Sequence, residues 1–152
     1  MYLLPSSIMG QYFKAVNISK KEYVCPWCVG QVAKLWEWSA NPHGSIFTLL
    51  LRKSSEGGGG DFHGLTYEQD RNAIPGRWAG DHVSLVGDYD ESRIWDHLDG
   101  YRNISKELVE SWNNFIEIPA MKLTFEECNS CGEARMRVFQ TNKTASTQPV
   151  AA

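Results

Sequence analysis

The sequence has no run rich in lysine or arginine, no long apolar stretch and no export signal. Its net charge is −3, so the composition does not indicate a general nucleic-acid binder, although a local basic face stays open. The longest apolar run, SIFTLLL, is far shorter than the ~20 residues that a membrane span needs. The first residues lack the basic region of a signal peptide. We therefore expect a cytoplasmic protein with no membrane partner.

Common catalytic motifs are also missing. The sequence contains no H-E-x-x-H, no G-x-S-x-G and no G-x-x-x-x-G-K-[ST]. Four consecutive glycines at positions 57–60 are followed by DFHG, without the lysine and hydroxyl residue of a phosphate-binding loop. The sequence therefore names no reaction, and we favour a protein that is not an enzyme.

The size and composition fit one globular domain. The chain has 152 residues, of which 42% are apolar and 22% charged, and both fractions are typical of soluble proteins. We expect a single α+β domain over residues 9–140. Residues 1–8 would be an upstream extension, with Met9 as the alternative start, and the polar residues 141–152 a disordered tail.

Apolar periodicity predicts a mixed or antiparallel sheet with about three helices. Alternation over residues 10–16 and 22–26 predicts an N-terminal hairpin, and residues 121–140 predict a C-terminal one. The segment WAGDHVSLVGDYD predicts a central strand, because both of its faces are partly apolar. Helical periodicity covers residues 29–38, 91–102 and 105–116.

The strongest motif is the pairing of the four cysteines. They form two C-x-x-C motifs, Cys25/Cys28 in CPWCVG and Cys128/Cys131 in CNSCGE. Two such knuckles provide the four thiolates of a tetrahedral site, typically for zinc, although thiolates alone do not separate zinc from iron. Closing a loop of this length costs about 4.7 kcal/mol, whereas structural zinc contributes roughly 10–16 kcal/mol in small peptides. We therefore predict a structural Zn²⁺ that joins the two hairpins.

Two alternatives involve catalysis. A thiol just before a helix can have a lowered pKa, so Cys25 and Cys28 also fit a thiol redox protein, but no thioredoxin-like frame surrounds them. A hydrolase-type metal centre could use the acidic residues and histidines around residues 81–90. The candidates are Asp81, His82, Asp88 and Asp90, with Asp61, His63, Asp96 and His97 nearby in sequence. Asp residues beside a strand are equally typical of turns.

Aromatic residues are abundant, with six each of Trp, Tyr and Phe. Most are expected in the core. Some tryptophans are candidates for the surface of an unknown protein partner, because tryptophan is enriched at interfaces. The candidates are Trp27, Trp36, Trp38 and Trp78.

Three segments resemble a group of small microbial proteins with no established activity. They are MGQYFKAVNISKKEY, AKLWEW and WAGDHVSLVGDY, and they cover about half of the chain. The resemblance implies a start at Met9 and brings no activity with it. It also implies that the C-x-x-C pairs are an elaboration rather than the shared feature of the group.

Overall fold

The computed structural model describes residues 11–54, 56, 62–134 and 136–137. The predicted extension 1–8, the run of four glycines and the predicted tail 141–152 lie outside the described residues. The sequence-based domain boundaries therefore stay predictions.

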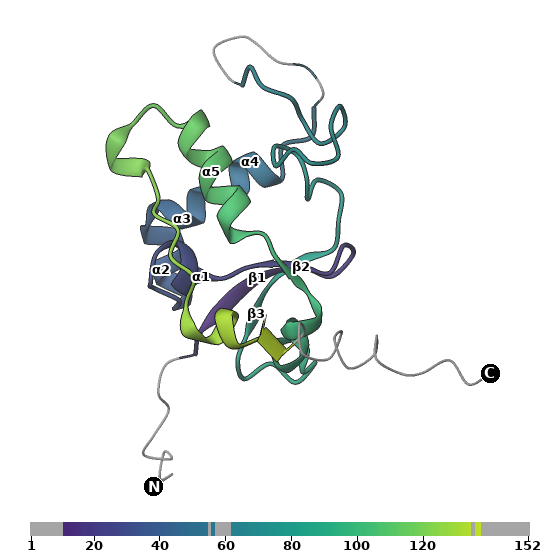
Figure 1. Ribbon diagram of the computed structural model, residues 1–152, viewed down its shortest axis with the longest axis vertical. Helices are drawn as coiled ribbons and strands as arrows, with labels where there is room; N and C mark the ends of the chain where they lie inside the picture. Colours follow the sequence, from purple (N-terminus) through teal and green to yellow (C-terminus); the bar gives the residue numbers. More distant parts are fainter. Residues whose placement is uncertain (1–10, 55, 57–61, 135, 138–152) are drawn as a thin grey trace, which may run out of the picture.

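A four-stranded mixed sheet organises the described residues (Figure 1). Its order is β3-β1-β2-β4, and the strands are β1 (Phe13–Asn17), β2 (Glu22–Val24), β3 (Val83–Gly87) and β4 (Arg102–Asn103). β1 pairs antiparallel with β2 and β3, whereas β4 runs parallel to β2. The N-terminal hairpin is confirmed, and its turn is closed by a hydrogen bond from Lys20 N to Asn17 Oδ1 (2.9 Å). The sheet and its helices confirm the α+β class.

The predicted central position of β3 is wrong. β3 lies at one end of the strand order and pairs with β1 alone. Its Leu85 is 38% exposed, whereas Lys14–Asn17 of β1 are all buried. Apolar residues on both faces of a short strand do not separate an edge strand from one that is covered on both sides. The interior positions belong to β1, between β3 and β2, and to β2, between β1 and β4.

The helices are shorter and more numerous than predicted. They are α1 (Pro26–Val29), α2 (Leu35–Ala40), α3 (Pro42–Ser45), α4 (Phe47–Leu50), α5 (Ser105–Phe115) and the 3₁₀ helices η1 (Ile94–Gly100) and η2 (Pro119–Met121). The continuous helix predicted over residues 29–38 is broken, because Gln31 has φ +60°. The second piece starts at Leu35, where Glu37 Oε2 accepts hydrogen bonds from Ala33 N and Lys34 N.

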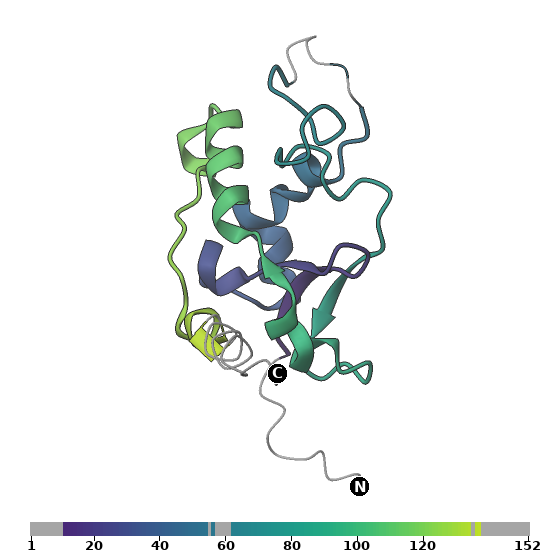
Figure 2. The ribbon, with the colours of Figure 1, turned by 45° about the vertical axis from the view of Figure 1, so that its right-hand side comes forward.

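α5 agrees with the prediction and packs on the core. Leu108, Val109 and Trp112 are its buried apolar residues, at helical spacing. α4 and α5 lie together above the sheet in both views (Figures 1 and 2). The largest side chains buried with them include Trp78, Ile46, Leu49, Leu50 and Ile104.

The predicted C-terminal hairpin is wrong. Residues 122–128 have no strand pairing, and residues 129–134 are helical. The extended part is held instead by a side chain of α5: Asn113 Nδ2 donates to Leu123 O (2.7 Å), and Asn113 Oδ1 accepts from Leu123 N (2.8 Å). Alternating apolar residues show only that one side of an extended chain is covered, and here Leu123 and Phe125 pack on the core without a partner strand.

Candidate metal centre

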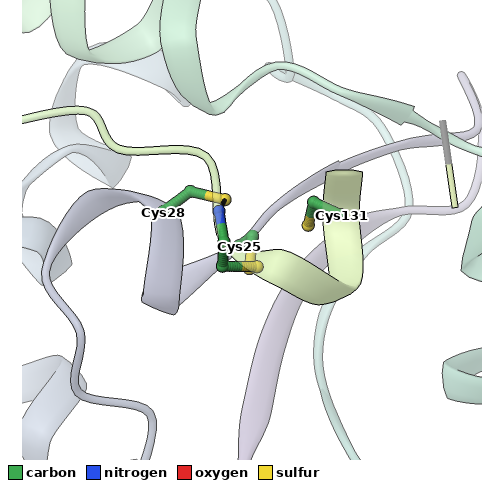
Figure 3. A group of neighbouring side chains, drawn as sticks. Cys25, Cys28 and Cys131 are labelled. Atoms are coloured by element: carbon green, nitrogen blue, oxygen red, sulfur yellow. Dashed lines mark hydrogen bonds between the residues drawn. The ribbon is translucent and has the colours of Figure 1, made fainter. Parts of the chain in front are cut away.

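The four cysteines come together in one cluster. Their Sγ atoms all lie within 4.8 Å of one another, and Cys25 Sγ is 3.8 Å from Cys128 Sγ. Figure 3 shows three of the side chains, from the N-terminal and C-terminal segments, converging on one point. With Zn–S bonds of about 2.3 Å, a tetrahedron has sulfur–sulfur distances of about 3.8 Å. The donor set and its spacing therefore fit one tetrahedral ion.

Each C-x-x-C pair lies in a helical turn and not in a hairpin knuckle. Cys25 directly follows β2, and Pro26 begins α1 with a φ that suits a first helical position. The turn is closed by hydrogen bonds from Cys28 N to Cys25 O (3.1 Å) and from Gly30 N to Pro26 O (2.8 Å). In the second pair, Gly132 N donates to Cys128 O (3.0 Å). Each turn brings two sulfurs to the same side.

Direct hydrogen bonds connect the two turns. Cys128 N donates to Cys28 Sγ (3.5 Å), and Glu126 N donates to Cys28 O (2.9 Å). The C-terminal segment therefore meets α1 in a fixed register, and this register places Cys128 and Cys131 opposite the first pair.

A polar network from β4 and α5 supports the first pair. Asn103 Nδ2 donates to Cys28 Sγ (3.8 Å), and Asn103 Oδ1 accepts hydrogen bonds from Ser105 N (3.0 Å) and from the Ser105 hydroxyl. Ser105 Oγ in turn accepts from Cys25 N (2.9 Å). Outer groups of this kind orient metal ligands. No sequence pattern predicts this network, because it depends on the parallel pairing of β4 with β2.

The protein's own groups favour a thiolate at Cys131 over one at Cys25 or Cys28. Hydrogen bonds with Cys131 and Cys28, together with burial, raise the pKa of Cys25 far above its ordinary value. The hydrogen bond with Cys131, together with burial, raises the pKa of Cys28 to about 12. Hydrogen bonds from Cys25, Cys28 and Tyr23 lower the pKa of Cys131. Ionising Cys25 and Cys28 beside a Cys131 thiolate therefore requires a nearby cation.

The geometry does not support thiol redox chemistry at Cys25 and Cys28. Reactive thiols have a lowered pKa and are partly accessible. These two side chains are 0% and 1% exposed, and both have raised pKa values.

The acidic residues and histidines around residues 81–90 do not form a shared centre. Asp81 accepts hydrogen bonds from Lys20 and from Asn17 Nδ2, and Asp88 Oδ1 accepts from Tyr12 N (3.0 Å). Asp90 Oδ1 accepts from Ser92 N in a local turn, and His82 is exposed. Within the described ranges, the only group of three or more potential ligands is the cysteine cluster.

The remaining candidates of that alternative are separate. Asp96 pairs with Arg93 on the surface, while His63 and His97 are exposed. Asp61 lies outside the described residues. These observations leave the hydrolase hypothesis without a site in the part of the chain that the structure describes.

Of the four candidate tryptophans, only Trp36 is well exposed. Its exposed fraction is 64%, whereas Trp38 and Trp78 are buried. Trp27 is half-buried and packs edge-on against Tyr12 and Trp95. Trp36 lines an apolar groove of about 460 Å³ together with Leu35, Trp38, Ser39, Gly44, Phe47 and Leu85.

No known protein family, no curated protein and no solved structure matches the chain. Among the helices of the described residues, none is long and apolar enough to cross a membrane. The function is therefore argued from the site itself.

Proposed function

We propose that Cys25, Cys28, Cys128 and Cys131 bind one zinc ion that holds the fold together, in a protein that acts as a binding or interaction module. The observation that carries the proposal is the convergence of all four sulfurs within 4.8 Å. Four cysteines placed by two segments about a hundred residues apart meet at one point, at a spacing that suits tetrahedral zinc.

The role is structural because four thiolates fill the coordination sphere. A catalytic zinc ion keeps one position for water or substrate, and this donor set leaves none. Cys25, Cys28 and Cys131 are also buried, with exposed fractions of 0%, 1% and 7%. The ion would have little contact with solvent.

The segment that gains most from the metal is the C-terminal one. Residues 122–128 have no strand pairing, and hydrogen bonds with Asn113 and Cys28 are among the contacts that hold them. Zinc would fasten this segment to the hairpin on which the sheet is built. The binding free energy would then contribute directly to folding.

The interaction role rests on the groove beside Trp36. Leu35, Trp36 and Leu85 are exposed there at 55%, 64% and 38%. Exposed apolar side chains gathered in one groove are typical of contact surfaces for other molecules. An enzyme mechanism has no comparable support among the described residues.

Metal analysis of the purified protein tests the proposal. We expect one equivalent of zinc in protein expressed without added metal, and loss of zinc in Cys128→Ser. Ser130→Ala is the matched control, because Ser130 lies between the two cysteines and is exposed. A result of one equivalent of iron instead of zinc would support the four-thiolate site but show that its metal is iron. Wild-type protein that takes up neither metal would refute the proposal.

A further inference from the structure

Lys14 is a buried cation that has no acidic partner in the part of the chain that the structure describes. Lys14 is 9% exposed and belongs to β1, an interior strand of the sheet. Among the described residues, no carboxylate lies within ion-pair distance of its ammonium group. A buried charge without an opposite charge is costly, so its position calls for a counter-charge.

Aromatic rings surround the Lys14 ammonium group. Nζ lies 4.3 Å from the ring centroid of Trp95, 5.6 Å from that of Tyr23 and 5.7 Å from that of Trp27. Such contacts attract a cation but do not neutralise it. Two of these rings also belong to the neighbourhood of the cysteines: Trp27 lies between Cys25 and Cys28, and Tyr23 Oη is 3.4 Å from Cys131 Sγ.

The strand register places Lys14 on the same face as the cysteines. Val16 is paired with Tyr23 and Ala15 with Val24, so the next position along β1 puts Lys14 opposite Cys25. Directly opposite residues of an antiparallel pair project to the same face of the sheet. Lys14, Tyr23 and Cys25 therefore share one face of the hairpin.

We propose that Lys14 is the buried counter-charge of the metal site and raises its affinity for a divalent ion. This inference rests on the proposed zinc site. Four thiolates around a divalent ion leave an excess of two negative charges, and the low dielectric of the interior strengthens their attraction to a nearby cation. The surrounding aromatic rings keep water away from this cation. In this role Lys14 acts on the metal site through its positive charge and is not a metal ligand.

The first experiment measures zinc affinity by competition with a chelator. Lys14→Met keeps the length and apolar stem of the side chain and removes the charge, whereas Lys14→Arg keeps the charge. We expect Lys14→Met to bind Zn²⁺ about 10–100-fold more weakly, as for other outer groups of metal sites, and Lys14→Arg to retain most of the affinity. Lys53→Met is the control, because it changes the net charge equally at an exposed residue that pairs with Glu68.

The second experiment measures the effect of the Lys14 charge on the midpoint potential of bound iron, which separates charge from protein stability. Protein reconstituted with iron has one more negative charge at the site in the ferrous form than in the ferric form. Loss of a nearby cation therefore makes the midpoint potential more negative in Lys14→Met and leaves it unchanged in Lys53→Met. Should Lys14→Met not fold, Lys14→Gln removes the same charge with a polar side chain.

The outcomes separate the two proposals. A wild-type protein that binds neither zinc nor iron contradicts the metal site itself. A wild-type protein that binds through all four cysteines, with unchanged affinity and potential in Lys14→Met, contradicts the role of Lys14 alone. Equal weakening in Lys14→Met and Lys14→Arg, without a shift in potential, would show that Lys14 contributes through packing and would also overturn the inference.

Discussion

The two faces of the N-terminal hairpin satisfy their polar groups in different ways. On one face, which we call the ion-pair face, Glu22 and Asn17 are opposite each other. Glu22 accepts hydrogen bonds from Arg77 Nε (3.0 Å) and Trp78 Nε1 (2.9 Å), and Asn17 Nδ2 donates to Asp81 (2.7 Å). Glu22 is paired with Arg77 and Asp81 with Lys20, so these charges have their partners within the protein.

The other face, which we call the thiol face, carries Lys14, Tyr23 and Cys25. Here the protein provides a cation and hydrogen-bond donors, but neighbouring thiols and burial raise the pKa of Cys25 and Cys28. With the proposed zinc site, one hairpin is stabilised by its own side chains on one face and by a metal ion on the other. The predictions below test this difference, beginning with the metal.

Removing the metal should have the largest effect. When free zinc exceeds its Kd a thousandfold, binding adds about 4 kcal/mol to the free energy of unfolding. Urea unfolding of the wild-type protein with and without a chelator measures this difference, and Cys128→Ser should show no chelator effect. Equal unfolding midpoints with and without the chelator would mean that the thiol face, like the ion-pair face, is stabilised by the protein's own side chains without a metal ion.

Glu22→Gln should be the next largest change, and it should depend on pH. Burial raises the pKa of Glu22, but hydrogen bonds from Arg77 and Trp78 outweigh burial and hold it below the ordinary 4.5. A carboxyl with a lowered pKa stabilises the fold above its ordinary pKa, and this contribution is lost as the pH falls through the folded value. At pH 7 we expect a loss of about 1.5–3 kcal/mol, typical of hydrogen bonds to a charged group.

The pH profile distinguishes this effect from metal loss in acid. Wild type and Glu22→Gln carry the same four cysteines, so the metal contribution cancels in the difference between their free energies of unfolding. That difference should be constant near neutral pH and shrink below about pH 4.5. A difference that does not change down to pH 3 would contradict a charged Glu22 in the folded protein.

Asn103→Ala should weaken the thiol face without abolishing its site. The substitution removes the hydrogen bond to Cys28 Sγ and the acceptor that orients Ser105. We expect zinc affinity to fall about tenfold, at the lower end for outer groups of metal sites. Asn114→Ala is the matched control, because Asn114 is an exposed asparagine of α5, the helix that begins at Ser105. An equal effect of both substitutions in the chelator assay would exclude the proposed support.

Trp36→Ala should have the smallest effect on stability, because Trp36 belongs to neither face. Its side chain is largely exposed, so the free energy of unfolding should change by less than about 0.5 kcal/mol. Trp78→Ala is the contrasting variant, since Trp78 is fully buried and bonded to Glu22, and it should cost about 3–5 kcal/mol. Similar losses in the two variants would show that Trp36 is part of the fold and not a contact surface.

Local patterns predicted those parts of the molecule that local contacts determine. Alternation around Ala15 and Tyr23 indicated the hairpin, the apolar stripe from Leu108 to Trp112 indicated α5, and the spacing within each C-x-x-C pair indicated two neighbouring ligands. Each signal comes from residues a few positions apart whose geometry follows from backbone repeat and side-chain type.

The features that were missed depend on pairing between distant segments. The edge position of β3 follows from the strand order. Residues 122–128 run without a partner strand because the Asn113 side chain takes up their backbone hydrogen bonds at Leu123. The roles of Lys14 and Asn103 require the register of β1 with β2 and of β2 with β4. A periodic pattern does not contain such information, because the same alternation fits several registers.

The separation of 103 positions between Cys25 and Cys128 also has a consequence during synthesis. At translation rates of about 5–20 residues per second, the first pair leaves the ribosome roughly 5–20 s before the second. During this interval Cys25 and Cys28 can hold only half of the coordination sphere, exposed to other metals and to oxidants. For the proposed zinc site, metal loading would thus be a late event, completed only when Cys128 and Cys131 emerge.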